Sequence, residues 1–294
     1  MLNFDRFVGI DWSGAKGKRT SSIQGAQITR DGSHPDIVHP PIYKNWSRAE
    51  VADWIEVQTQ KDTRTLVGID CNFGYGARVL EEQLGAKTTA ENLWAHIEDV
   101  CADVPNYYAA PFWEKYADYY WFGGKQPAWF DAKKLRRETE WACGEVGLGQ
   151  PESPFKLFSP TQVGKGGLAG MRMLHDLKAR CVARLAVWPF DSDETCNQAQ
   201  LVITEIYPRQ FIKRADLGSK KIDNCRDLDI CLERLGAGSI SLPFVSDHIA
   251  DAIVSAAGLR QLCGIGNSVP NEIARPAKMS IQAALKEGWI FGVI

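Results

Sequence analysis

The chain lacks the features of a membrane or exported protein. No run of apolar residues in its 294 positions approaches the roughly 18 that a membrane-spanning helix needs. Its first residues, MLNFDRF, carry neither the basic segment nor the apolar stretch of a signal peptide. We therefore expect a protein that does not associate with membranes and that resides in the cytoplasm.

Motifs that would identify a zinc, nucleotide or nucleophile site are also missing. Eight cysteines and five histidines are dispersed along the chain without any CxxC pair, so zinc-ligand spacing is absent and reduced, packed thiols are expected. The glycine-rich segment 163–174 could seat an anion, but it has no phosphate-loop Gly-Lys-Ser/Thr and follows no clear strand. No Gly-x-Ser-x-Gly occurs.

The chain also has no large excess of positive or negative charge. The formal net charge is −2, which gives no overall basic footprint for nucleic acid. A polyanion would have to bind to a local basic patch, or to metal ions held by carboxylates.

Short apolar runs alternate with longer amphipathic ones, the pattern of an α/β protein with a mixed sheet and a crossover helix. Pro40 and Pro41 predict an edge position for the third strand, and Ser47 with Glu50 predicts a capping box. Strands are expected at 6–12, 20–28, 37–43, 64–70, 183–190 and 199–208, and helices at 47–60, 167–180 and 247–262.

The amino-acid composition changes between about residues 85 and 164. Eleven aromatic residues lie between 107 and 130, followed by the basic run KKLRR at 133–137. We interpret this segment as an aromatic-rich helical insertion within a single domain, 1–294, with most rings packed and one or two exposed. The alternative is a stacking platform for single strands, which would include Lys125, Lys133, Lys134, Arg136 and Arg137.

Carboxylates occupy related positions in this pattern. Two predicted strands read VGID and end at Asp11 and Asp70. Each aspartate alone is explained by a turn, but acids at the ends of neighbouring strands converge. In the helix 247–262, Asp247, Asp251 and Ser255 recur every four residues as a polar stripe on an apolar helix.

Clustered acids of this kind predict a metal. Like charges repel strongly where water is excluded, and a buried carboxylate without a partner is costly. A divalent cation relieves the repulsion, and hard oxygen ligands suit Mg²⁺ or Mn²⁺.

Five short motifs together carry a resemblance: VGIDWSGA at 8–15, VGIDCNFG at 67–74, TEIYPRQ at 204–210, SDHIADA at 246–252 and EGWIFGV at 287–293. In this order they resemble the ribonuclease H-like fold, and more closely the family named domain of unknown function 429, regarded as predicted nucleases. The resemblance implies an α/β fold with a ribonuclease H-like mixed sheet flanked by helices. It also implies two metal ions held by acids at the matching positions, Asp11, Asp70, Asp247 and Asp251.

The chemistry implied by this resemblance is phosphodiester hydrolysis of a nucleic acid or a small phosphodiester, with two ions about 3.5–4 Å apart. Asp11 is expected to bridge both ions. Glu205 matches the family pattern, although its placement differs from the usual superfamily helix glutamate. His248 could shuttle a proton or simply face solvent.

Lys16, Lys18 and Arg19 follow Asp11 directly and could contact substrate phosphates, or form a solvated hairpin tip. Two rival functions stay open. One is an actin-like-fold phosphotransferase or ATPase, for which Trp12 and Ser13 interrupt the expected Asp-x-Gly loop. The other is a non-catalytic nucleic-acid-binding module.

Overall fold

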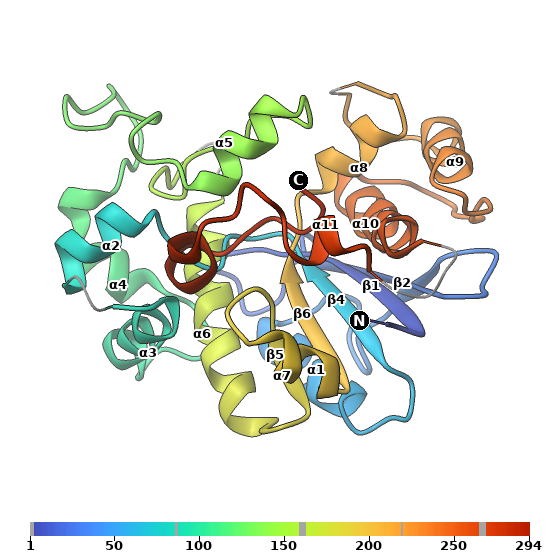
Figure 1. The fold of residues 1–294 in the computed structure, drawn as a ribbon, viewed down its shortest axis with the longest axis horizontal. Coiled ribbons are helices and arrows are strands. Elements are labelled where there is room, and N and C mark those ends of the chain that lie inside the picture. The colour runs from blue at the N-terminus through green and yellow to red at the C-terminus, as the bar shows by residue number, and fades with distance from the viewer. Residues whose placement is uncertain (1–2, 86–87, 159–162, 219, 265–268) are drawn as a thin grey trace.

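A six-stranded mixed β-sheet lies at the centre of the computed structural model, with helices on both faces (Figure 1). The structure describes residues 3–85, 88–158, 163–218, 220–264 and 269–294. The spatial order of the strands is β3-β2-β1-β4-β6-β5. The first three pair antiparallel and the remaining neighbours pair parallel. The strands are β1 (Arg6–Asp11), β2 (Gln24–Thr29), β3 (Asp36–Val38), β4 (Thr65–Ile69), β5 (Leu185–Val187) and β6 (Leu201–Glu205).

The predicted strands are confirmed, and most are shorter than the apolar runs suggested. β3 occupies an edge and ends at Val38, two residues before Pro40, because proline cannot donate to a ladder. β4 is interior, between β1 and β6. The structure is therefore an α/β fold built on a mixed sheet.

Helices connect and cover these strands (Figure 1). The longest, α6 (Gly164–Arg180) and α10 (Asp247–Cys263), were both predicted. The others are α1 (Arg48–Gln58), α2 (Ala77–Leu84), α3 (Ala90–Cys101), α4 (Ala110–Lys115), α5 (Glu138–Glu145), α7 (Asp193–Gln198), α8 (Pro208–Arg214), α9 (Cys225–Arg234) and α11 (Asn271–Ala274), with the 3₁₀ turn η1 (Ala117–Tyr119) and the π turn η2 (Ala283–Glu287).

Local capping fixes where two of the predicted helices begin. The Ser47 hydroxyl accepts from the backbone N–H of Glu50, and the Glu50 carboxylate accepts from the backbone N–H of Ser47. The predicted capping box is therefore present at the start of α1. The Ser246 hydroxyl accepts from the backbone N–H of Ile249 and caps α10.

Alternate residues of each central strand enter two separate apolar layers. Phe7, Leu66 and Val202 pack on the face covered by α8, α9 and α10. Val8 and Val67, one position later, pack on the opposite face with α1, α3 and α6. Because both faces are buried, the strands read as nearly continuous apolar runs.

Two paired glycines allow α10 to lie close to the sheet. Gly9 of β1 and Gly68 of β4 are direct partners in the parallel register. A Cβ atom on Gly9 would lie 2.4 Å from the carbonyl oxygen of Ala252, and one on Gly68 would lie 2.8 Å from Cδ1 of Leu259. The repeated VGID sequence therefore places a glycine pair beneath α10. Two residues later it places a pair of aspartates at the carboxyl ends of β1 and β4.

The aromatic segment packs as core. Buried rings such as Phe112, Tyr120 and Phe130 belong to the same apolar cluster as the sheet residues on the α1, α3 and α6 face. Of its eleven rings, Phe122 and Trp129 are the exposed ones, at 46% and 45%. The packed-core interpretation, with one or two rings exposed, is confirmed.

The carboxylate of Glu287 ties the C-terminal segment to two other parts of the chain. One oxygen accepts from the backbone N–H of Ala77 at 2.6 Å, where α2 begins, and the other accepts from Glu138 at 2.7 Å, where α5 begins. Both helices thus have an acidic cap supplied from far away in the sequence. Across the described ranges, no helix is long and apolar enough to cross a membrane.

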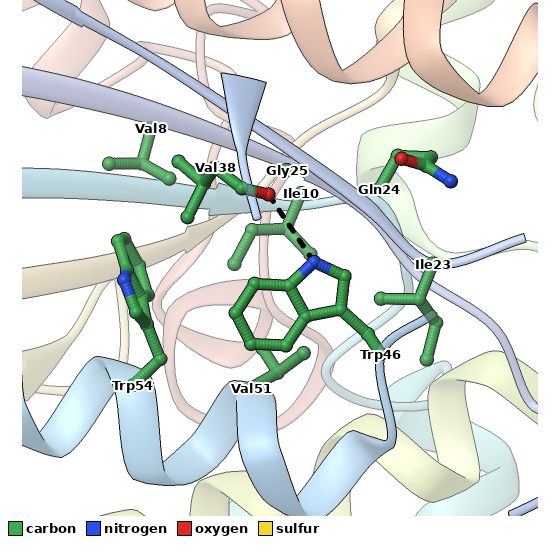
Figure 2. A pocket seen from close by; sticks show the side chains of 9 residues that line it. All are labelled: Val8, Ile10, Ile23, Gln24, Gly25, Val38, Trp46, Val51 and Trp54. Atoms are coloured by element: carbon green, nitrogen blue, oxygen red, sulfur yellow. Dashed lines mark hydrogen bonds between the residues drawn. The ribbon is translucent and has the colours of Figure 1, made fainter. Parts of the chain in front are cut away.

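A small void of about 10 Å³ lies between β1, β2 and α1 (Figure 2). Side chains such as Ile10, Trp46, Val51 and Trp54 surround it, and its lining is almost entirely apolar. An apolar space of this size has room for about one water molecule and is too small for a ligand.

The contact between α10 and the glycine pair predicts a large effect of Gly9→Ala. The added methyl group would meet the backbone of α10, which cannot move without the whole helix, so we expect a loss of at least about 3 kcal/mol in the free energy of unfolding. Urea denaturation measures this loss.

Gly25→Ala in β2 is the matched control. Its Cβ would lie 3.3 Å from Cβ of Val38 on the edge strand, which can yield slightly, so a smaller loss is expected. Equal losses in the two variants would show that the approach of α10 is not the cause.

Candidate active site

A cleft of about 400 Å³ opens at the carboxyl ends of β1, β4 and β6. Ile10 and Ile69 are register partners, and the backbone N–H of Asp70 donates to the carbonyl of Ile10 at 2.9 Å. The two strand-end aspartates therefore leave the sheet side by side. The ionisable residues that line the cleft are Asp11, Asp70, Cys71, Arg137, Glu140, Glu152, Glu205, Tyr207, Arg209, Lys220, Lys221, Asp247, His248 and Asp251.

Asp11 points toward α10, because it has the same strand parity as Gly9. Its Oδ2 lies 2.6 Å from Nδ1 of His248, and the ring nitrogen donates to the carboxylate. Asp11 is only 7% exposed. Burial raises the pKa of the Asp11 carboxyl against the opposing effect of His248, and the same hydrogen bond raises the pKa of His248.

Among the described residues, no side chain forms such a hydrogen bond with Asp70 or Asp251. Burial, followed by the charges of Asp11 and Asp251, raises the pKa of Asp70 well above its usual range. Burial, followed by the charges of Asp11 and Asp247, raises the pKa of Asp251 to about 7. Without a compensating cation, burial and the neighbouring acids therefore favour the protonated forms of Asp70 and Asp251.

Asp247, at the start of α10, is compensated. Its Oδ2 accepts from Nζ of Lys221 at 2.7 Å. This hydrogen bond lowers the pKa of Asp247, with burial opposing it. Of the four aspartates predicted as metal ligands, Asp247 is therefore the one already paired with a lysine.

Glu205 lines the cleft but is paired with a buried arginine, unlike Asp70 and Asp251. Its register partner is Ile69, one residue before Asp70, so its side chain has the parity of the opposite face. Both of its oxygens accept from Arg137, at 2.8 and 2.5 Å, and Oε2 also accepts from the backbone N–H of Phe73 at 3.1 Å. Glu205 thereby holds the segment that follows Asp70.

Arg137, which the alternative of a stacking platform would include, is buried. It is 1% exposed, so it cannot form part of a surface stacking platform. Its Nε donates to Glu140 at 2.7 Å, and burial raises the pKa of Glu140 to about 7. No signal in KKLRR distinguishes this buried arginine from the exposed Lys133 and Lys134 or the partly exposed Arg136.

The predicted phosphate-binding residues do not reach the cleft. Lys16 and Lys18 are exposed on the connection after β1, and neither lines the cleft. Arg19 forms a two-pronged ion pair with Glu50 and lies over the ring of Tyr43, 3.6 Å from its centre. The structure instead brings Arg209, Lys220 and Lys221 to the cleft. Arg209 lies four residues after Glu205, the last residue of β6, and no pattern in the sequence marks it as a residue of the cleft.

In the parts of the chain that the structure describes, no three histidine, cysteine, aspartate or glutamate side chains are arranged to hold a metal ion. Asp11 is engaged by His248 and Asp247 by Lys221. The acids gather in one cleft, but they are not oriented as a closed ligand set.

Comparisons with models of protein families, with curated proteins and with solved structures find no match to this chain.

Replacing Arg137 tests the buried ion-pair network. Arg137→Met leaves Glu205 and Glu140 buried without a cation, so the free energy of unfolding should fall by about 3–5 kcal/mol. Urea denaturation measures the loss, and adding Glu205→Gln should recover part of it. The neighbouring Arg136→Met, which removes a partly exposed side chain, should cost less than about 1 kcal/mol. A full-sized loss in that control would refute the network as the cause.

The raised pKa of Asp251 predicts how stability depends on pH without divalent cations. Its pKa is about 7 in the folded protein and about 3.9 when unfolded, so the folded state binds more protons in between. The free energy of unfolding should therefore fall as pH rises from about 4 to about 7, and less steeply in Asp251→Asn. Denaturation series across this range measure both slopes. Asp53→Asn on α1, outside the cleft, should keep the wild-type slope, and an unchanged slope in Asp251→Asn would contradict the prediction.

Proposed function

We propose that this protein is a metal-dependent phosphodiester hydrolase with a ribonuclease H-like fold. The observation that carries the proposal is the meeting of Asp11, Asp70 and Asp251 in one cleft. They come from β1, from the end of β4 and from α10. Burial raises the pKa of all three, and the charges of neighbouring acids add to this shift. Such a set costs stability unless it serves a ligand.

The mixed sheet supports the ribonuclease H-like assignment. Acids lie at the carboxyl ends of β1 and β4 and on a late helix that crosses the same sheet face, as the sequence motifs imply. The cleft at the strand ends is also where open α/β sheets commonly bind ligands.

The donor chemistry fits Mg²⁺ or Mn²⁺. Carboxylate oxygens are hard ligands, and burial together with neighbouring acids raises the pKa of Asp70 and Asp251, a shift that a bound cation would reverse. Asp11, Asp70 and Asp251 would hold the metal, while Asp247 stays with Lys221. When bound, divalent metal neutralises charge at a phosphate and lowers the pKa of a water nucleophile.

His248, Arg137 and Glu205 support this site through hydrogen bonds. His248 holds a proton at Nδ1 against Asp11, and its side chain is 42% exposed, so it can exchange protons with water in the cleft. A cation at Asp11 would compete with this imidazole. Arg137 and Glu205 fix the backbone that follows Asp70. Glu205 thus acts as a positioning residue in this proposal.

A cleavage assay on labelled RNA, DNA and hybrid strands with Mg²⁺ or Mn²⁺ tests the function. Asp11→Asn and Asp70→Asn should each lower the rate by about 100-fold or more, since each removes a ligand of the charge-stabilising centre. EDTA should abolish cleavage. Asp53→Asn, on the surface of α1, should retain the wild-type rate and controls for the loss of one carboxylate outside the cleft. Loss of cleavage in the identically purified Asp11→Asn and Asp70→Asn excludes a contaminating nuclease.

Equal inactivity of wild type and variants, all folded, would contradict a general nuclease. Small phosphodiesters would then be assayed in the same way. ATP binding by the wild type would favour a phosphotransferase, and the absence of any effect of metal would favour a non-catalytic module.

A further inference from the structure

One cationic side chain in the cleft is not used by the acids. Arg209 lines the cleft at the second residue of α8 and is partly buried. Within the described ranges it makes no hydrogen bond or ion pair, whereas Arg137, Lys220 and Lys221 each have a carboxylate partner. A guanidinium in a cleft without a partner is available to an anionic ligand.

A hydroxyl group lies beside this guanidinium. Tyr207 also lines the cleft, and burial raises the pKa of its phenol to about 12 although Arg209 opposes the shift. Tyr207 is therefore a neutral O–H donor at physiological pH. The hydroxyl oxygen of Tyr207 and Cδ of Arg209 both lie close to Gly149, at 3.2 and 3.7 Å from the position of an added Cβ, so the two side chains share one wall.

This wall lies within electrostatic reach of the acidic cluster. The charges of Asp70 and Asp251 contribute to the raised pKa of Tyr207. An anion bound by Arg209 and Tyr207 would therefore lie in the same cleft as Asp70 and Asp251. Guanidinium groups bind phosphate through two parallel hydrogen bonds, and a phenol adds a third donor.

We propose that Arg209 and Tyr207 bind a phosphate group of the substrate, next to the bond that is cleaved. The proposal rests on the proposed function for the cleavage step, but the phosphate site itself does not need metal. A cleft of about 400 Å³ has the size of a small-molecule site. The substrate class is therefore a nucleotide-sized phosphate ester, or the phosphorylated end of a single strand.

Binding measured in EDTA tests the site without turnover. The probes are inorganic phosphate, thymidine 5′-phosphate, and a single-stranded oligonucleotide with and without a 5′-phosphate. Arg209→Gln should weaken binding of the phosphorylated probes by about 10-fold or more, and Tyr207→Phe by several-fold, since each removes a donor to a charged group. Lys61 precedes β4 and lies near the amino ends of the strands, away from the cleft, so Lys61→Gln should bind like wild type.

The outcomes separate this proposal from the proposed function. Asp70→Asn should keep the dependence on Arg209 even if it abolishes cleavage. Tight binding of thymidine 5′-phosphate would identify a small ester, whereas preference for the phosphorylated oligonucleotide would identify a strand end. Equal binding by Arg209→Gln and wild type, or no binding of any phosphorylated probe by folded wild type, would overturn the phosphate site. A protein that binds phosphate but cleaves nothing would contradict only the hydrolase.

Discussion

The close approach of α10 to β1 and β4 is the constraint on which the rest of the site depends. Gly9 and Gly68 are partners in the sheet, and side chains there would collide with Ala252 and Leu259. With the helix seated on this pair, His248 and Asp251 in its first turns come beside the strand-end aspartates. Packing of small residues thus sets the separation of the charged ones.

Buried charge in this protein is divided into a balanced part and an unbalanced part. Arg137 satisfies Glu205 and Glu140 with directed hydrogen bonds, and the three together hold the backbone around the cleft. Asp70 and Asp251 are buried beside other acids, which add to the effect of burial in raising their pKa. A network that is fully paired is a framework, whereas an excess of one sign marks a place where a ligand is needed.

The aromatic segment serves the cleft as well as the core. Its rings extend the apolar layer beneath α3 and α6. Its last part delivers Arg137 to the end of β6, while Gly149 approaches Tyr207 and Arg209 closely. Glu287 then links the start of α5 to the C-terminal segment. The segments around Arg137, Glu205 and Glu287, which are distant in sequence, therefore meet near the carboxyl end of β6.

The sequence by itself determined the strands, the principal helices and the meeting of the VGID aspartates, because periodicity, capping and strand ends are local properties. Only the tertiary structure decided which charges have partners. Arg137 and Glu205 are 68 residues apart, and Arg19 and Glu50 are 31 apart. No local pattern encodes such pairings, since they depend on which elements pack together and on strand parity. For the same reason Arg209, with no partner among the described residues, became visible only in the folded cleft.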